Sequence, residues 1–324
     1  MSQIVPVSIL IPTMNRNQSF KRTIECLMSK EYIPAHIIVV DQSPDSEVRQ
    51  LNQNILDKYS NLTKTTYLFQ EIPSLTRARN LAIKHCDDEI MIFSDDDVDV
   101  NDDTLINIYK VMSNSKIAMI AGIDENEEVS DRSSLMSYIG YFFCTKSFKN
   151  RNIGHVTKSM LGRFPHSDVK GEVETQWAMG YFFVVRKSLI DKWKLNFDEK
   201  FSGYAYAEDL DFSHSYYQKA KTEGLKCILI DKVKVKHMVS REYRTPSSKS
   251  TFMFVINREY LSYKHKTGVL SRMAIRWNNI GIFMFRLARN GKSGKSMDVI
   301  RAQWKCDSNR NKIRSGDLDD MMYR

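Results

Sequence analysis

The sequence predicts an α/β protein with a Rossmann-like sheet, followed by a basic and mainly helical C-terminal region. Short apolar runs rich in β-branched residues alternate with helical patterns through the first hundred residues. This alternation is typical of a parallel sheet covered by helices on both faces. The chain of 324 residues is 42% hydrophobic and 27% charged, which is the composition of an ordinary globular protein.

The first hundred residues predict strands and helices in strict alternation. Strands are expected at 7–11, 36–40, 65–69 and 90–93, and helices at 19–30, 46–59 and 75–85. In sheets of this type, ligands bind beyond the carboxyl ends of the strands. The residues that follow those ends, at 12–16, 41–45 and 94–99, are therefore the candidates for a binding site.

The rest of the chain has weaker patterns. Residues 124–177 predict loops and short helices, and a strand is expected at 178–186. A helix follows at 209–222, with Gly224 as the residue that ends it. Two further strands are expected at 225–230 and 233–237, and beyond residue 240 the pattern is helical without an internal repeat.

Cysteines and apolar runs indicate the compartment. The five cysteines are scattered and have no CxxC spacing, which is typical of a reducing compartment and excludes a disulfide framework or a zinc site. No apolar run approaches the roughly 18–20 residues that span a bilayer. The apolar stretch at 4–12 is short and lacks a basic leader, so we expect no signal peptide and a cytoplasmic protein.

The positive charge is concentrated near the C-terminus. The net charge is +9, but residues 264–314 contain 13 Lys and Arg against two Asp, so the remainder of the chain carries −2. A basic segment on a near-neutral body favours contact with a polyanion or an anionic membrane surface.

Glycine is absent from the first 121 residues, because the first glycine is Gly122. Domains that hold a diphosphate through backbone N–H groups use a glycine-rich turn, as in GxGxxG or the P-loop. Its absence excludes the dehydrogenase and P-loop classes. If this domain binds a nucleotide diphosphate, a divalent cation is the obvious means of neutralising the phosphates.

Asp95, Asp96 and Asp97 directly follow the strand expected at 90–93. Adjacent carboxylates repel one another unless a cation or solvent screens them. Carboxylate oxygens suit Mg²⁺ or Mn²⁺. The alternative is a solvated acidic turn, because further aspartates continue the run.

Three other places in the sequence hold polar residues, each with two possible roles. Glu208 and Asp209 begin a predicted helix, where they are either partners of the helix dipole or a general base for a hydroxyl. His237 ends a strand with a basic face formed by Lys232, Lys234 and Lys236, and is either structural or a metal ligand. Arg77 and Arg79 either pair with phosphate or with Glu71.

Six segments in a fixed order cover roughly residues 5–240: VSILIPTMNR (7–16), IIVVDQSPD (37–45), SLTRARNLAI (74–83), EIMIFSDDDV (89–98), MGYFFVVRKSLI (179–190) and YAEDLDFSHSY (206–216). No single segment is specific, but the series resembles the family 2 glycosyltransferases, which have the GT-A fold. The resemblance implies a catalytic domain at 1–240, with a nucleotide-binding half (1–123) and an acceptor-binding half (124–240), and a basic helical C-terminal region at 241–324.

The resemblance also implies a role for each matching residue. Asp97 matches the last Asp of the DxD motif, a metal ligand, and His237 matches a further metal contact. Asp209 matches the catalytic base of the ED motif, with Glu208 beside it, and Asp95 matches the acid that contacts the donor ribose. The other implied nucleotide-sugar-binding residues are Pro12, Thr13, Met14, Arg16, Asp41, Gln42, Arg79 and Asp96, with Asn80 next to Arg79.

The implied activity is an inverting transfer of a sugar from a nucleotide-diphosphate sugar to the hydroxyl of a glycan or lipid-linked acceptor, with Mn²⁺ or Mg²⁺ as cofactor. Surface polysaccharide or glycan biosynthesis is the implied setting. Two positions depart from the family pattern, because Gln42 replaces an acid and Met14 replaces an aromatic residue. The donor base is therefore open among uridine, thymidine and guanosine.

The segment 273–289 interleaves aromatic and aliphatic residues with arginines. This pattern is typical of an interfacial segment on anionic lipid, which would place the protein peripherally on the inner face of the cell membrane. The alternative is a helix packed on the catalytic domain with snorkelling arginines.

Two rival functions are weaker. A nucleotidyltransferase also uses carboxylates and Mg²⁺, but its usual glycine-rich N-terminal loop is missing. A nucleic-acid-binding protein could use the basic region, but no recognisable nucleic-acid module accompanies it, so we expect no nucleic-acid partner. A degenerate, non-catalytic transferase domain is disfavoured because the DDD and ED motifs are intact.

Overall fold

The computed structural model describes residues 2–126, 135–147, 149–150, 152–165, 168–201, 205–240, 242, 246–290, 294–318 and 321. Its helices are α1 (Asn17–Met28), α2 (Ser46–Asp57), α3 (Leu75–Lys84), α4 (Thr104–Met112), α5 (Leu135–Phe142), α6 (Lys187–Trp193), α7 (Glu208–Thr222), α8 (Ser247–Lys264), α9 (Gly268–Asn290), α10 (Gly294–Ser308) and α11 (Arg310–Ser315). Its strands are β1 (Gln3–Thr13), β2 (Tyr32–Asp41), β3 (Lys64–Phe69), β4 (Ile90–Ser94), β5 (Val98–Val100), β6 (Ile117–Asp124), β7 (His155–Val156), β8 (Gly162–Arg163), β9 (Glu172–Glu174), β10 (Phe182–Arg186) and β11 (Lys226–His237).

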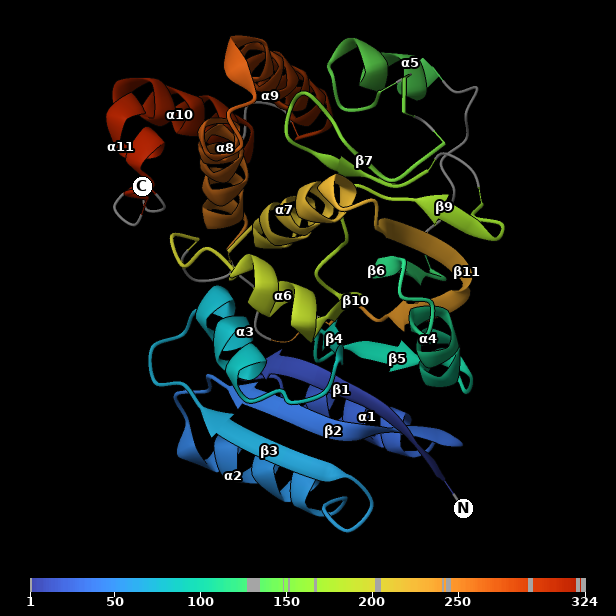
Figure 1. Cartoon of the computed structure of the whole chain (residues 1–324). Helices are drawn as coiled ribbons and strands as arrows, with labels where there is room; N and C mark the ends of the chain where they lie inside the picture. Colours follow the sequence, from blue (N-terminus) through green and yellow to red (C-terminus); the bar gives the residue numbers. More distant parts are fainter. Residues whose placement is uncertain are drawn as a thin grey trace.

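One mixed sheet organises residues 3–237, in the order β3-β2-β1-β4-β10-β6-β11-β5, with β9 also paired to β11 (Figure 1). Strands β1 to β4 pair in parallel, as the sequence predicts. The strand expected at 178–186 forms β10, which runs antiparallel to both β4 and β6. Because β1, β2 and β4 are parallel, their carboxyl ends lie along one edge of the sheet.

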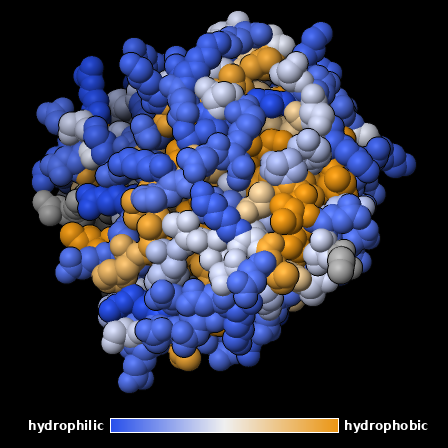
Figure 2. Space-filling model, turned by 60° about the horizontal axis from the view of Figure 1, so that its bottom comes forward, coloured by the Kyte–Doolittle hydropathy of each residue, from blue (hydrophilic) through white to orange (hydrophobic). Residues whose placement is uncertain are grey.

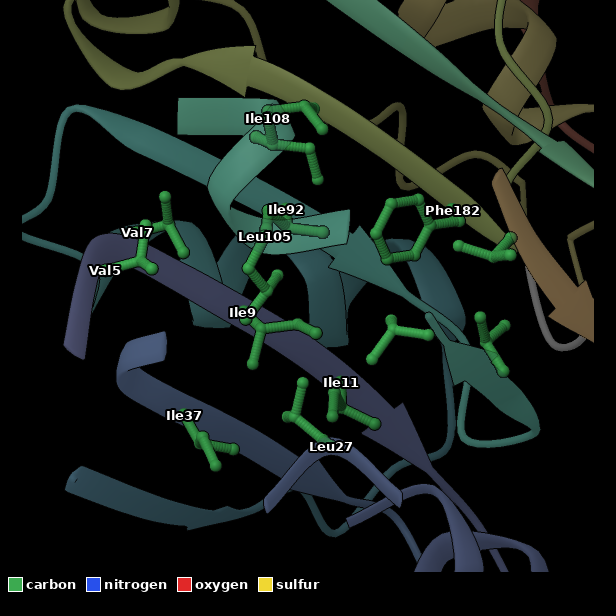
Figure 3. Close-up of a cluster of buried hydrophobic side chains, with 14 of the residues drawn as sticks. Val5, Val7, Ile9, Ile11, Leu27, Ile37, Ile92, Leu105, Ile108 and Phe182 are labelled. Atoms are coloured by element: carbon green, nitrogen blue, oxygen red, sulfur yellow. The ribbon is translucent and has the colours of Figure 1, made fainter. Parts of the chain in front are cut away.

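The two faces of the sheet have separate cores. Alternate residues of β1, such as Val7 and Ile9, pack against α1, α2 and α4 on one face (Figure 3). Leu10 and the opposite set of strand residues pack against α3, α6 and α7 on the other face. This arrangement confirms the sheet covered on both sides, because continuous apolar strands supply side chains to two helical layers.

The C-terminal helices form a third core. Residues of α8 to α11 pack with Trp177, Phe201 and Leu210, which belong to the catalytic part of the chain. Figure 1 shows these helices on the side of α7 that is remote from β2 and β3. The helical character expected beyond residue 240 is confirmed. None of the described helices combines the length and the apolar composition needed to cross a lipid bilayer.

The surface is mixed in character. Figure 2 shows hydrophilic side chains over most of one face, with hydrophobic side chains gathered in smaller areas between them. The most exposed large hydrophobic side chains include Trp304, Leu270 and Ile72, at 71%, 69% and 65%. Two of these three lie in the basic C-terminal helices.

Three expectations about the elements were wrong or incomplete. The strands expected at 225–230 and 233–237 are one strand, β11, which continues through a register shift between Leu229 and Lys234. The sequence pattern did not predict β5, α4 and β6. The region 124–177 contains the short strands β7, β8 and β9 besides loops and the helix α5, and residues 127–134, 148, 151, 166 and 167 of it lie outside the described residues.

Candidate active site

The candidate site lies where β1, β4 and β11 end. Asp95, Asp96 and Asp97 follow β4, and His237 is the last residue of β11. Antiparallel pairing of β11 with β5 puts His237 opposite Val98, next to the aspartate triplet. The imidazole of His237 also stacks on the ring of Tyr181, with 4.9 Å between ring centroids. Residues 140 positions apart are therefore fixed in one place by the sheet.

Asp96 is a buried structural anchor of this cluster. Its side chain is 2% exposed, accepts a hydrogen bond of 2.7 Å from the Thr13 hydroxyl, and lies 2.7 Å from Arg16 Nη1. The hydroxyl of Thr23 donates to its carbonyl oxygen. Burial raises the pKa of Asp96 to about 7, against the opposing effects of Arg16 and Thr13.

Asp97 is held by three groups. Arg16 Nη2 lies 2.6 Å from Oδ2, the Ser240 backbone N–H donates to the same oxygen at 2.8 Å, and His237 Nε2 is 3.3 Å from Oδ1. Burial alone would raise the pKa of Asp97, but His237 and Arg16 hold it well below its usual range. The ionised carboxylate is thus favoured. The alternative of a solvated acidic turn is wrong, because Asp96 and Asp97 are only 2% and 4% exposed.

Asp95, Asp97 and His237 fit a divalent cation. One ligand atom from each lies within 4.8 Å of the others. The buried Oδ1 of Asp97 makes no regular hydrogen bond with the described residues, and the 3.3 Å between it and Nε2 of His237 separate two candidate metal ligands. Two carboxylates and one imidazole form a donor set that suits a hard or borderline divalent ion.

Arg79 links this cluster to the ED motif. Its side chain is 1% exposed, and Nη1 lies 2.5 Å from Glu208 Oε1, while Nη2 lies 3.1 Å from Asp95 Oδ1 and 2.8 Å from the Gly180 carbonyl oxygen. Of the two alternatives, pairing with Glu71 is therefore wrong for both arginines. Arg77 pairs with Glu199, in the segment between α6 and α7, and Arg79 pairs with Glu208, the first residue of α7.

Asp209 is oriented by backbone N–H groups. Its Oδ2 accepts from Gly180 N at 2.8 Å, and its Oδ1 accepts from Leu210 N at 2.7 Å. The backbone before it is strained, because Ala205 and Ala207 adopt φ of 52° and 70°. Glu208 is 5% exposed, and burial raises its pKa well above the usual range while Arg79 opposes that shift. Glu208 and Asp209 therefore do more than interact with the dipole of α7, because their side chains make specific contacts with Arg79 and with backbone N–H groups.

Gly180 permits the close approach of the two motifs. A Cβ at this position would lie 3.1 Å from Arg79 Nη2 and 3.2 Å from the Cβ of Asp209. A larger residue would therefore push on the guanidinium and the carboxylate together. Sequence reasoning did not single out Gly180, although it lies in the segment 179–190, because the need for glycine comes from contacts with residues distant in the chain.

The end of β2 lies beside the cluster and is closed by hydrogen bonds. Asp41 is fully buried and accepts from Ser43 N, Asn52 Nδ2 and the Tyr67 hydroxyl, each at 2.7 Å. Gln42 accepts two hydrogen bonds at Oε1, from Ser74 N and Gln70 Nε2. The acceptor oxygen of the Gln42 amide is therefore engaged within the protein, which leaves its amide N–H groups.

The predicted residues thus fall into two neighbouring groups. Hydrogen bonds and ion pairs connect Thr13, Arg16, Asp96, Asp97 and His237 in one network, and Asp95, Arg79, Glu208 and Asp209 in another. Pro12 and Met14 lie at the end of β1, beside Asp41 and Gln42 of the adjacent β2, and Gln42 N donates to the Thr13 carbonyl oxygen. Tyr181 and Ser240, which support His237 and Asp97, were not predicted.

An acidic cluster suited to a cation, with a separate carboxylate on α7, stands at the carboxyl edge of a doubly covered sheet. These are features of enzymes that transfer a group from a nucleotide diphosphate. The family model of glycosyl transferase family 2 matches residues 8–170. The chain belongs to this family and is a glycosyltransferase. None of the curated proteins compared with the chain matches it in sequence.

Solved structures support the same fold. A mannosyltransferase from Pyrobaculum calidifontis, in complex with GDP-Man and Mn²⁺, has a TM-score of 0.55 and 13% identity over 96% of this chain and 84% of its own. S. aureus TarS 1–349 with UDP-GlcNAc has a TM-score of 0.54 and 14% identity, over 98% and 89%. GalNAc-T7 with UDP, GalNAc and Mn²⁺ has a TM-score of 0.52 and 15% identity, over 95% and 57%. The chain has the GT-A fold.

Proposed function

We propose that the chain is an inverting, metal-dependent glycosyltransferase, which moves a sugar from a nucleotide-diphosphate sugar to an acceptor hydroxyl. One observation carries the proposal. The guanidinium of Arg79 contacts both Asp95, in the candidate cation cluster, and Glu208, the neighbour of Asp209. The site for the leaving diphosphate and the candidate base are therefore held at opposite ends of one rigid, buried group.

Asp95, Asp97 and His237 are the residues that would hold the cation. When bound, the cation supplies a Lewis acid that stabilises the negative charge of the departing diphosphate. An imidazole among the ligands favours Mn²⁺ over Mg²⁺, because Mg²⁺ prefers an all-oxygen shell. Two of the similar structures contain Mn²⁺, which is consistent with this choice.

The donor would lie along the ends of β1 and β2. Gln42 is the base-reading residue in this proposal, because its amide N–H groups can donate to a carbonyl oxygen of uracil or guanine. Asp41 would act indirectly, by holding the loop after β2 through its three hydrogen bonds. Met14, at the end of β1, would pack on the base, and Arg16 and Asp95 would contact the phosphates and the ribose.

Asp209 would remove the proton from the acceptor hydroxyl as that oxygen attacks the anomeric carbon. Its carboxylate is fixed by Gly180 N and Leu210 N, so its orientation does not depend on substrate. Attack from the face opposite to the leaving diphosphate inverts the anomeric centre. Residues 124–240 would bind the acceptor.

We also propose that the enzyme works in the cytoplasm, peripherally on the inner face of the cell membrane, on a glycan or lipid-linked acceptor in surface glycan biosynthesis. The support is the charge distribution, with a net +11 between residues 264 and 314, and the exposed apolar residues of α9. Flotation with anionic vesicles tests the location.

Substitution of Asp209 by Asn tests the mechanism. We expect Asp209→Asn to lower the transfer rate at least about 100-fold, since a positioned general base contributes on that scale. Donor binding should persist, so Mn²⁺ with UDP-GlcNAc or GDP-mannose should raise the melting temperature of the variant as much as that of the wild type. Rates come from chromatographic detection of released nucleotide diphosphate.

Asp57→Asn is a matched control, because Asp57 is an exposed carboxylate at the end of α2. It should leave transfer unchanged. EDTA should abolish both the transfer and the nucleotide-induced rise in melting temperature. Full turnover by Asp209→Asn would remove Asp209 as the base, and turnover that survives EDTA would remove the metal from the mechanism.

A further inference from the structure

A concave region lies outside the candidate active site, where α8, α9 and α11 meet. It is a cavity of about 650 Å³. Five of the nine residues that line it are cationic, none is acidic, and two are tyrosines. The cationic residues are Lys200, Lys264, Lys266, Arg272 and Arg314.

Most of this positive charge is not neutralised within the protein. Lys264 pairs with Asp198 and Asp211, at 2.7 and 2.6 Å. The other four cations have no carboxylate within ion-pair distance among the described residues. Lys200 donates to the carbonyl oxygen of Ser315, and the guanidinium of Arg272 lies 4.8 Å from the ring centroid of Tyr263. Like charges held together in this way repel one another, and an anion would relieve that repulsion.

The helix α9 adds to the positive potential. Its first residue, Gly268, lines the cavity, and the helix extends for 23 residues. The N-terminus of a helix carries a partial positive charge and free N–H groups, which favour phosphate. Two independent features, the unpaired cations and the helix start, therefore favour the same kind of ligand.

The cavity is separate from the donor site. Lys264 contacts Asp211 of α7, whereas Asp209 of the same helix contacts Gly180. Residues two positions apart on a helix point about 200° away from each other. The cavity therefore lies on the side of α7 opposite to the candidate base.

We propose that this cavity binds a phosphate or diphosphate group. The residues after Gly268 favour a phosphate that belongs to a lipid, because Val269, Leu270 and Met273 are 62%, 69% and 59% exposed beside it. A charged head group in the cavity would leave these side chains in contact with its apolar tail. The inference goes beyond the proposed transfer reaction and does not depend on it.

The test compares the wild type with a cavity variant and a control variant. All three are measured in EDTA, so that neither transfer nor cation binding contributes. Arg272→Glu/Arg314→Glu reverses two of the unpaired cations. Lys58→Glu/Lys84→Glu makes the same change in net charge at exposed lysines of the sheet half. If the melting temperature shows that Arg272→Glu/Arg314→Glu does not fold, Arg272→Gln/Arg314→Gln is used as the cavity variant instead.

Two probes distinguish the source of the phosphate. Sodium pyrophosphate is titrated by calorimetry, and vesicles of phosphatidylcholine with phosphatidylglycerol are compared with pure phosphatidylcholine by sedimentation. We expect the cavity variant to bind at least one probe about tenfold more weakly than the lysine control. Weakened pyrophosphate binding supports a site open to free anions, and weakened vesicle binding alone supports a lipid head group. Equal behaviour of the cavity variant and the control with both probes overturns the proposal.

Discussion

At the scale of single residues, the site depends on a buried arginine between two acids. Arg79 is 1% exposed, and its partners Glu208 and Asp95 are 5% and 31% exposed. An ion pair at this depth is expensive to desolvate, so its main effect is on geometry rather than on net stability. The arginine fixes Asp95, a residue of the proposed cation site, and, through Glu208, the start of α7 that carries Asp209.

Removing only one partner should therefore be costly. We expect Arg79→Met to lower the free energy of unfolding by about 3–5 kcal/mol, because Glu208 would be left buried without its cation. The double variant Arg79→Met/Glu208→Gln should recover most of that loss. Urea denaturation measures both, and Mn²⁺ titration should show weakened binding in each, since Asp95 loses its anchor in both.

Arg77→Met is the matched control, two residues along the same helix. Its guanidinium pairs with Glu199, and both side chains are about half exposed, at 49% and 50%. The loss there should stay below about 1 kcal/mol. Equal losses for the two arginines would contradict the positioning role of Arg79, as would normal Mn²⁺ binding in the double variant.

At the scale of elements, α7 joins the active site to the C-terminal helices. Its Asp209 faces Gly180, its Asp211 accepts from Lys264 and contacts His265, and its half-buried His214 contacts the Gln176 carbonyl oxygen. The Nδ1–H of His214 donates to the Gln176 carbonyl oxygen, and Nε2 accepts from Gln218. This arrangement requires a neutral imidazole.

The pH dependence of stability should report on His214. Burial, together with nearby His265, lowers the pKa of His214 to about 4, against the opposing effects of the Gln176 carbonyl group and Asp211. Because the folded pKa is below the ordinary 6.5, the unfolded chain binds the proton first as the pH falls. Stability is therefore lost between about pH 6.5 and 4, by up to about 3 kcal/mol.

Urea denaturation between pH 7.5 and 4.5 checks this dependence, with His214→Gln as the comparison. The variant keeps a polar group at this position but cannot titrate, so its stability should fall less steeply with decreasing pH. His85→Gln is a control, since His85 is an exposed residue at the end of α3. Identical slopes for the wild type and His214→Gln would contradict the inference.

Helices and strands were predictable where the local hydrophobic pattern of the sequence agreed with the burial of those residues in the structure. The strands β1, β2 and β4 are continuous apolar runs, so their position follows from the sequence alone. The three residues of β5 are too few to give a pattern, and they are strand only because β11 pairs with them. Likewise, the polar pair at 231–232 resembles a turn, whereas β11 continues through it, within the register shift that separates its two stretches of pairing with β6.

The sequence predicts which residues form the candidate site, but not which of them contact one another. Asp95, Asp97 and Asp209 stand in recognisable short motifs. The partnership of Arg79 with Glu208 joins residues 129 positions apart, and no local pattern specifies it. The same holds for Gly180, whose small size matters only because Arg79 and Asp209 converge on it.

At the scale of the whole molecule, one surface combines exposed apolar residues with the basic end of the chain. On α9, Leu270, Met273, Trp277, Ile280 and Met284 form a stripe with a spacing of three or four residues, and each is at least 39% exposed. The opposite face of α9 is packed, because Ile275 and Asn278 are fully buried. The interpretation as a packed helix therefore holds for one face of α9, and the interfacial segment stays a prediction for the exposed face.

The stripe continues onto α5. The indole N–H of Trp277 donates to the Phe142 carbonyl oxygen, and the two rings lie 5.2 Å apart. Phe142 and Tyr138 are 63% and 61% exposed. An exposed apolar area of this kind, beside a segment with a net +11, fits the interface of an anionic bilayer, where aromatic and aliphatic side chains enter and cations meet lipid phosphates.

Charges placed within the stripe should prevent this association. We expect Ile280→Glu/Met284→Glu to reduce flotation with vesicles of phosphatidylcholine and phosphatidylglycerol at least about tenfold, because burial of the apolar side chains is lost and the new carboxylates are repelled. Leu51→Glu/Leu62→Glu alters two leucines that are equally exposed, at 52% and 51%, in the sheet half, and should float like the wild type. A truncation would test this less cleanly, because α8 to α11 share a core with Trp177 and Leu210, and their removal would expose it. If the α9 variant floats as well as the wild type, the membrane does not bind this face.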